Sequence, residues 1–318
     1  MDTDTRRLYI QIAEMYYNQD LTQSQIAQKT GINRSTISRL LKKIREEGIV
    51  KIIINYDLDD LTMERQLQEK FGLKKAIVTT VDSNQSDDIK LTALGQACAR
   101  FLDQIIEDND TIGFSWGSSL AKTVQALDVT VKRENIRCVP LLGGPANKLD
   151  SDCHVNTICY QAARKFNGKS IMIDFPAIVE KPAMRTGIIE TEYFKEIQHI
   201  WQQINVAVFG IGSIDIVHSS STWQAFYGNS AIEQLISEGV AGDICSRFFD
   251  IHGKTAQTHL SDRTISIPLE QLAGLRYSIG VAQSLDKVKG ILGALRSGKM
   301  NVLVTTSETA AALLNDNA

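Results

Sequence analysis

The chain has 318 residues, 43% of them hydrophobic, and a formal net charge of −3 at pH 7, which predicts about two domains with sizeable cores. No run approaches the ~20 apolar residues of a membrane span and no apolar signal core follows Met1, so the composition excludes a transmembrane protein. The five cysteines are scattered without a CxxC pair, which excludes a disulfide scaffold and indicates reduced thiols in a soluble, cytoplasmic protein.

Charge is unevenly distributed along the chain. Residues 1–56 carry nine Lys or Arg against six acids, a net charge of +3, whereas residues 57–318 carry a net charge of −6. A modestly basic head on an acidic body fits a DNA-binding module attached to a domain that does not touch DNA, although a charge of +3 alone is weak evidence. The acidic stretch that follows residue 56 places the domain boundary there, which predicts two domains, 1–56 and 57–318.

A first helix is predicted near the amino terminus, with Arg6 and Arg7 placed before it. Its apolar residues recur at helical spacing and are expected to complete the core of the head. They are Leu8, Ile12, Ala13, Met15 and Tyr16.

The stretch 21–41, LTQSQIAQKTGINRSTISRLL, predicts two helices joined by a turn. Thr22 is placed to cap the first helix, and Ala27 is small where the helices must cross. Gly31 supplies the positive φ of a tight turn. The buried side of the pair is predicted to be Ile26, Ile32, Ile37, Leu40 and Leu41.

The outward side of the second helix is dense in hydroxyl, amide and basic groups, which suit phosphate oxygens and base edges in a major groove. An ordinary helical hairpin with a solvated face is the alternative. Gly48 and the following IVKIIINY (49–56) predict the strand of a winged variant. The predicted DNA-binding residues are Thr22, Gln23, Asn33, Arg34, Ser35, Thr36, Ser38, Arg39, Lys42 and Lys43.

The body begins with an acidic hinge, predicted at 57–61, and then alternates helices with apolar strands. This alternation predicts an α/β fold with a doubly wound, mostly parallel sheet and ligands at the carboxyl ends of its strands. The predicted helices are 62–72, 88–107, 120–127, 287–298 and 307–316, and the predicted strands are 74–80, 111–116, 136–142, 205–213, 276–282 and 300–306.

Three features at strand ends can form a pocket for a phosphorylated small molecule. The turn GFSWGSS (113–119) opens a helix, so its amides can meet an anion, although Gly/Ser turns are common. The loop from Gly143 carries polar side chains as far as Asn156, which a plain loop explains nearly as well. In VAGDICSRFFDIHG (240–253), Asp243 and Arg247 are either ligand contacts or a structural ion pair.

Three further sets of residues have side chains that could serve a ligand, a metal or a pocket wall. Lys287 and Lys289 begin a helix where a lysine can neutralise phosphate, or else lie on the surface. Cys153, His154 and Cys159 lack a fourth ligand and a known spacing, so we predict no metal site and no cofactor. Trp116, Trp201 and Trp223 are interpreted as core or pocket-wall aromatics.

Over essentially all 318 residues the chain resembles the SorC family of bacterial sugar-responsive transcription regulators, and most of all its sorbose-operon branch. The likeness is carried by INRSTISRLLKKIREEGIVKI, IGFSWG, PLLGGP, HVNTI, DFPA, FGIGS, VAGDICSRFFDIHG and YSIGVAQSLDKVKGILGAL. It implies a winged helix-turn-helix followed by a domain similar to glucosamine-6-phosphate deaminase and ribose-5-phosphate isomerase. It also implies a tetramer that binds double-stranded operator DNA under the control of a phosphorylated sugar, such as a sorbose phosphate.

The resemblance also assigns effector contacts residue by residue. Asp243 stands where relatives often have glutamate, and Lys287 matches the phosphate lysine of the motif AGGxxKxxAIxxAL. The two glycines of that motif are Gln283 and Ser284 here, which leaves the phosphate geometry open. The predicted effector residues are Gly113, Ser115, Trp116, Gly117, Ser118, Ser119, Gly143, Gly144, Pro145, His154, Asn156, Gly212, Asp243, Arg247 and Lys287.

Two other functions compete with this reading. A sugar-phosphate isomerase or deaminase would need a positioned carboxylate base and a ring-opening histidine, a set that the sequence does not assemble. A sugar sensor acting through protein partners would not retain specific DNA.

Overall fold

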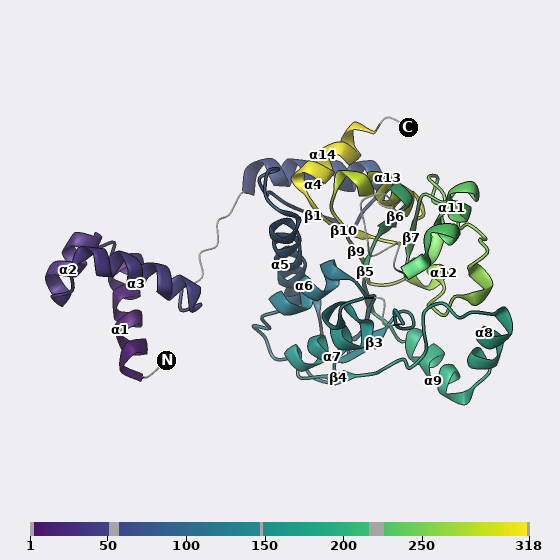
Figure 1. Cartoon of the computed structure of the whole chain (residues 1–318), viewed down its shortest axis with the longest axis horizontal. Coiled ribbons are helices and arrows are strands. Elements are labelled where there is room, and N and C mark those ends of the chain that lie inside the picture. The colour runs from purple at the N-terminus through teal and green to yellow at the C-terminus, as the bar shows by residue number, and fades with distance from the viewer. Residues whose placement is uncertain (1–2, 51–56, 147–148, 216–225, 317–318) are drawn as a thin grey trace. The chain divides into compact units, whose positions relative to one another are not determined.

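The computed structural model describes residues 3–50, 57–146, 149–215 and 226–316 (Figure 1). The chain divides into two compact units, Met1–Asn55 and Tyr56–Ala318. Within the described residues, no helix has the length and apolar character needed to cross a membrane.

The amino-terminal unit is a small helical domain, made of α1 (Thr3–Ala13), a π-helical turn (Glu14–Asn18), α2 (Gln23–Thr30) and α3 (Arg34–Glu46). Arg6 and Arg7 lie inside α1 and not before it, because the helix starts earlier than the apolar spacing predicted. Of the predicted wing strand, residues 51–56 lie outside the described residues. The buried core is Tyr9, Ile12, Ala13, Ile26, Ile37, Leu41 and Ile44.

Local sequence explains the helix ends in this unit. The Thr22 hydroxyl accepts a hydrogen bond from the Gln25 amide (3.3 Å), and the Gln25 side chain accepts from the Thr22 amide (2.8 Å), which forms a capping box. Gly31 ends α2 with φ 73°, as the turn requires. Ile26, Ile37 and Leu41 are buried as predicted, whereas Ile32 and Leu40 are only half-buried because they lie at the edge of the small core.

The carboxy-terminal unit is built on a seven-stranded sheet in which every pairing is parallel, with the order β1-β10-β9-β5-β2-β3-β4. The predicted parallel α/β fold is confirmed, and the inner strands are buried because helices cover them. Its strands are β1 (Lys75–Thr79), β2 (Thr111–Phe114), β3 (Arg137–Pro140), β4 (Lys169–Ser170), β5 (Val206–Gly210), β9 (Tyr277–Val281) and β10 (Val302–Thr306).

The helices of this unit agree with the predicted ones in part. The prediction of a hinge at 57–61 is wrong, because this segment forms the start of α4. The helices between 155 and 201 and the one that starts at Asn229 were not predicted. The helices are α4 (Asp57–Phe71), α5 (Asp87–Ile105), α6 (Ser118–Ala126), α7 (Val155–Lys165), α8 (Pro182–Ile189), α9 (Glu192–Trp201), α11 (Asn229–Ser237), α12 (Leu269–Leu272), α13 (Val288–Arg296) and α14 (Ser307–Asn315).

A second, antiparallel sheet contains β6 (Gly212–Ser213), β7 (Gly242–Ile244) and β8 (Arg247–Phe249). The stretch 205–213, predicted as one strand, therefore divides between two sheets at Ile211. In the large sheet the strand order reverses between β5 and β2, since β3 and β4 extend on one side and β9 and β10 on the other. Ligands of open α/β sheets bind at such a reversal, beyond the carboxyl ends of the strands.

Candidate functional site

The outer face of α3 presents the predicted basic residues to solvent. Arg34, Arg39, Lys42 and Lys43 are exposed, as is Ser38, and Lys42 lies 3.8 Å from Glu46. Thr36 is half-buried. This face offers four cations over about three turns of helix, an arrangement that can contact phosphates and base edges together.

Some of the predicted polar residues serve the helix ends. Asn33 caps α3, because its Oδ1 accepts hydrogen bonds from the Thr36 amide and the Ser35 hydroxyl, both at 2.8 Å. Thr22 is occupied in the same way at the start of α2, and Gln23, half-buried, is the first residue of that helix. The side chains of Thr22 and Asn33 therefore stabilise the helix starts, while Arg34, Arg39, Lys42 and Lys43 are exposed on α3.

In the carboxy-terminal unit, a cavity of about 470 Å³ lies where the strand order reverses; we call it the effector cavity. It brings together eight of the predicted effector residues from four separate stretches of chain. Those eight are Ser115, Trp116, Gly117, Ser118, Ser119, Gly212, Asp243 and Lys287. Gln283 and Ser284, which stand at the two glycine positions of the phosphate motif, also line the cavity. Lining residues that the sequence did not indicate are Asp87, Leu91, Leu120, Leu142, Gly210, Ile211, Tyr227, Cys245, Ser246 and Asp286.

The turn after β2 forms one corner of this cavity. Gly117 adopts φ 121° and no side chain caps the helix that follows. The first intrahelical bond runs from the Ala121 amide to the Gly117 carbonyl (3.0 Å), so the preceding amides of α6 lack intrahelical acceptors. The Ser115 hydroxyl accepts from the Gly210 amide (3.1 Å), which ties the ends of β2 and β5 together. Amides at a helix start favour phosphate.

Asp243 and Lys287 face the same cavity from β7 and the segment before α13. The small sheet and α13 approach closely because glycines form their contact. A Cβ on Gly290 of α13 would lie 2.4 Å from the Gly212 carbonyl oxygen of β6, and a Cβ on Gly242 of β7 would lie 2.9 Å from the Gly290 Cα. Burial raises the pKa of Asp243 to about 6, while the Ser246 amide (2.8 Å) and Lys287 act in the opposite direction. Burial lowers the pKa of Lys287, and Asp243 opposes that change.

The other predicted effector residues do not line this cavity. Gly113 lies within β2, where a Cβ would meet the Leu141 side chain. Gly143 packs against the Pro176 backbone, and Pro145 is buried beside it in the same loop. Arg247 donates to the Ser266 hydroxyl (2.9 Å) and carbonyl (3.2 Å) and makes no ion pair with Asp243.

Two polar residues of the 154–156 stretch have structural partners. The His154 Nδ1 accepts from the Asn156 amide (3.2 Å) and so caps α7. The Asn156 side chain bonds both the amide and the carbonyl of Ile173 at 3.1 Å. His154 therefore stabilises the start of α7, and Asn156 fastens α7 to the chain beyond β4.

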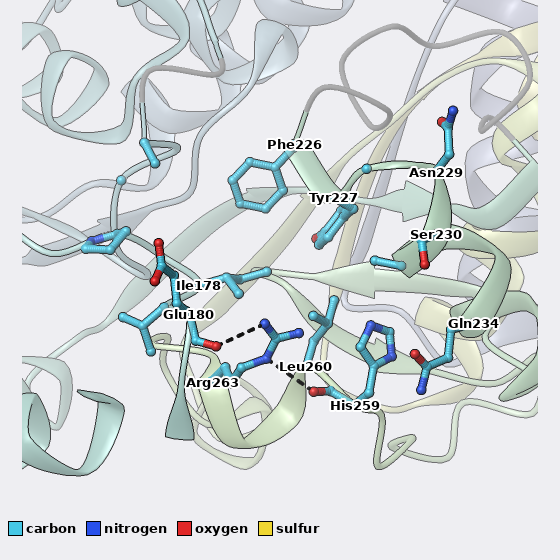
Figure 2. Close-up of a pocket in the computed structure, with 16 residues that line it drawn as sticks. Ile178, Glu180, Phe226, Tyr227, Asn229, Ser230, Gln234, His259, Leu260 and Arg263 are labelled. Carbon is cyan, nitrogen blue, oxygen red and sulfur yellow. Dashed lines mark hydrogen bonds between the residues drawn. The ribbon is translucent and has the colours of Figure 1, made fainter. Parts of the chain in front are cut away.

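A second cavity of about 550 Å³ lies next to the first, and Tyr227 lines both. Figure 2 shows Arg263, His259 and Gln234 along its floor, with Phe226 and Tyr227 above them. The Arg263 guanidinium donates to the carbonyls of Glu180 and His259, both at 3.4 Å. Gly144 lines this cavity and not the effector cavity.

Replacing Asp243 with asparagine should make the free protein more stable at neutral pH. The folded pKa of about 6 lies above the ordinary value of 3.8, so the charged carboxylate costs stability above pH 6 and the cost disappears as pH falls toward 4. The rise corresponds to about 3 kcal/mol. Urea unfolding of both proteins between pH 4 and 7.5 should show the variant gaining most at pH 7.5 and little at pH 4. An advantage that is constant with pH would contradict the raised pKa.

Comparisons with known proteins agree with this architecture. Residues 58–315 match the family described as "Putative sugar-binding domain", and residues 5–54 match the MarR family. The sorbitol operon regulator of Klebsiella pneumoniae is 46% identical over 314 residues, which cover 98% of this chain and 99% of that protein. The deoxyribonucleoside regulator of Bacillus subtilis (strain 168) is 31% identical, covering 99% of this chain and 100% of that protein.

A solved structure indicates the same family and architecture. The crystal structure of the full-length sorbitol operon regulator SorC from Klebsiella pneumoniae superposes with a TM-score of 0.84, at 46% identity, over 99% of this chain and 100% of that one. These relatives are named as regulators and not as enzymes, which argues against the isomerase or deaminase alternative. The chain belongs to the SorC family, and it is a sugar-responsive, DNA-binding transcriptional regulator.

Proposed function

We propose that this chain controls a carbohydrate catabolic operon and that a phosphorylated sugar bound in the effector cavity changes its affinity for operator DNA. The observation that carries the proposal is the meeting of the α6 amino terminus with Lys287 in one cavity. A helix start and an ammonium group both favour a phosphate over an uncharged sugar. The hydroxyls of Ser118 and Ser119 and the carboxylate of Asp243 would bind the sugar chain.

The charges of the cavity favour an effector with a single phosphate. Among its described lining residues Lys287 is the sole Lys or Arg, whereas Asp87, Asp243 and Asp286 are acidic. Among the described lining residues a second phosphate would find carboxylates and no further Lys or Arg, so a sorbose or sorbitol monophosphate fits better than a bisphosphate.

A panel of phosphorylated sugars tests both points. Sorbose 1-phosphate or sorbitol 6-phosphate should raise the unfolding temperature, and fructose 1,6-bisphosphate and unphosphorylated sorbitol should raise it much less. The same ligands are then added to a duplex selected by the full chain from a random pool. A monophosphate that stabilises the protein should also shift the operator Kd several-fold, in line with a coupling of about 1–3 kcal/mol. A panel without effect would refute the proposed effector.

The amino-terminal unit is proposed to bind the operator through Arg34, Ser38, Arg39, Lys42 and Lys43, in the cytoplasm. We also propose a homo-oligomer, a tetramer by likeness to the family, because paired recognition helices read half-sites about 34–36 Å apart. Sedimentation of the full chain with and without effector tests the assembly. A protein that remains monomeric at micromolar concentration would contradict it.

A further inference from the structure

We propose that α14 transmits effector binding toward the DNA-binding unit, with Thr309 and Lys70 as the positioning residues at its two ends. The inference rests on the proposed function, since it assigns the residues by which the effector cavity acts on operator affinity. Figure 1 shows α14 lying along α4, and the two helices pack together. Neither residue lines the effector cavity.

The first connection joins the cavity to the start of α14. Ser284 lines the cavity with φ 116°, a conformation that favours glycine and costs about 1–3 kcal/mol in other residues. Its amide donates to the Thr309 hydroxyl (3.0 Å), and Thr309 is fully buried. Thr306 shares a hydrogen bond with the same hydroxyl (3.1 Å). Thr309 therefore holds Ser284 in its strained conformation, three residues before Lys287.

The second connection reaches the start of α14 from a different element that lines the cavity, α5. Asp87 lines the cavity in the first turn of α5, and Lys90 lies one turn further along that helix. Lys90 forms an ion pair with Glu308 in the first turn of α14 (3.1 Å). A ligand that changes the spacing between Asp87 and Ser284 therefore acts on the same end of α14 through both connections.

The third connection fastens the far end of α14 to α4. The Lys70 ammonium donates to the carbonyls of Leu313 (3.2 Å), Leu314 (3.0 Å) and Asp316. Leu313 and Leu314 lie in the last turn of α14, where backbone carbonyls have no amide partner within the helix. Lys70 therefore caps this end of α14. In the sequence, α4 directly follows residues 51–56, which continue from the DNA-binding unit. Any shift of α14 is thus passed to the element nearest in sequence to that unit.

The structure also shows why α4 would move as one piece with its neighbours. Glu64 accepts from the Val78 amide (3.0 Å) and Gln68 accepts from the Ala76 amide (3.2 Å), so α4 is bound along the edge of β1. Packed elements change position as units, because close-packed contacts resist continuous deformation. The hydrogen bonds from the Lys70 ammonium join α4 and β1 to the end of α14.

Lys70→Met and Thr309→Val separate the two positioning roles, and each has a matched control. Lys74→Met removes a lysine of the same region whose ammonium donates to the Arg276 carbonyl (3.2 Å) and lies over the Tyr277 ring, not at the end of α14. Thr305→Val removes a buried hydroxyl without a hydrogen-bond partner among the described residues. Each full-length protein is titrated with sorbitol 6-phosphate and sorbose 1-phosphate, and its operator Kd is measured with and without saturating ligand.

Lys70→Met should bind ligand and ligand-free operator within about twofold of wild type, while the ratio of the two operator Kd values falls at least threefold toward one. Thr309→Val should weaken ligand binding about tenfold, as expected when a buried amide loses its acceptor. The controls should retain wild-type values. A Lys70→Met protein with the wild-type ratio would refute the role of α14 while leaving the proposed function intact. A wild-type protein whose operator Kd responds to neither ligand would refute both.

Discussion

Replacing Arg39 with alanine should weaken operator binding at least tenfold while the protein remains folded. Arg39 is exposed on α3, opposite the buried Ile37 and Leu41, and its removal opens no cavity in the small core. A guanidinium that reads a guanine edge contributes about 1–3 kcal/mol, and about 1.4 kcal/mol corresponds to a factor of ten. If Arg39 contacts a phosphate instead, the loss of affinity should be similar for all DNA sequences. The slope of log Kd against log salt concentration should then fall by about one.

Arg45→Ala is the matched control for this experiment. Arg45 is an exposed arginine of the same helix, in its last turn and on another side from Arg39. Fluorescence anisotropy with the selected duplex, at two salt concentrations, should show a much smaller loss for this variant than for Arg39→Ala. Equal losses would mean that general charge and not a defined face of α3 determines binding.

Replacing Lys287 with methionine should reduce affinity for the effector about 10- to 150-fold. Hydrogen bonds to charged groups contribute about 1.5–3 kcal/mol, and the cavity offers no second Lys or Arg among its described lining residues to substitute. Methionine keeps most of the volume, so packing beside β7 should persist. The loss should be largest for phosphorylated ligands, because the interaction that disappears is electrostatic.

Lys289→Met provides the comparison, because Lys289 is exposed and lies 3.5 Å from Asp215 outside the cavity lining. Calorimetric titration should give wild-type affinity for this variant. A second measurement follows from the charge of Lys287, which lowers the pKa of Asp243 against the effect of burial. In Lys287→Met the pKa of Asp243 should rise further. The pH range over which ionisation of Asp243 lowers the free energy of unfolding should therefore extend upward. An unchanged range would show that the two groups do not interact.

The effector cavity was predictable from sequence where one stretch of chain builds one local structure. Ser115 to Ser119 follow a buried parallel strand and open a helix, so their place at the carboxyl edge of the sheet follows from strand order alone. Histidine and asparagine are residue types that often contact ligands, yet here His154 caps α7 and Asn156 bonds to Ile173. Short-range hydrogen bonds to backbone compete with ligand binding for such side chains, and a sequence window does not show which one prevails.

By itself, the sequence determined the helix pair of the amino-terminal unit and the parallel character of the large sheet. Caps such as Thr22 and Gly31 act within four residues, and apolar periodicity acts within one element, so neither depends on distant contacts. Tertiary structure alone decided that Asp243 faces the cavity while Arg247, four residues later, turns to Ser266. The physical reason is register: Ile244 pairs with Arg247 across a turn at Cys245 and Ser246, and the glycine contact with α13 then places Lys287 beside Asp243.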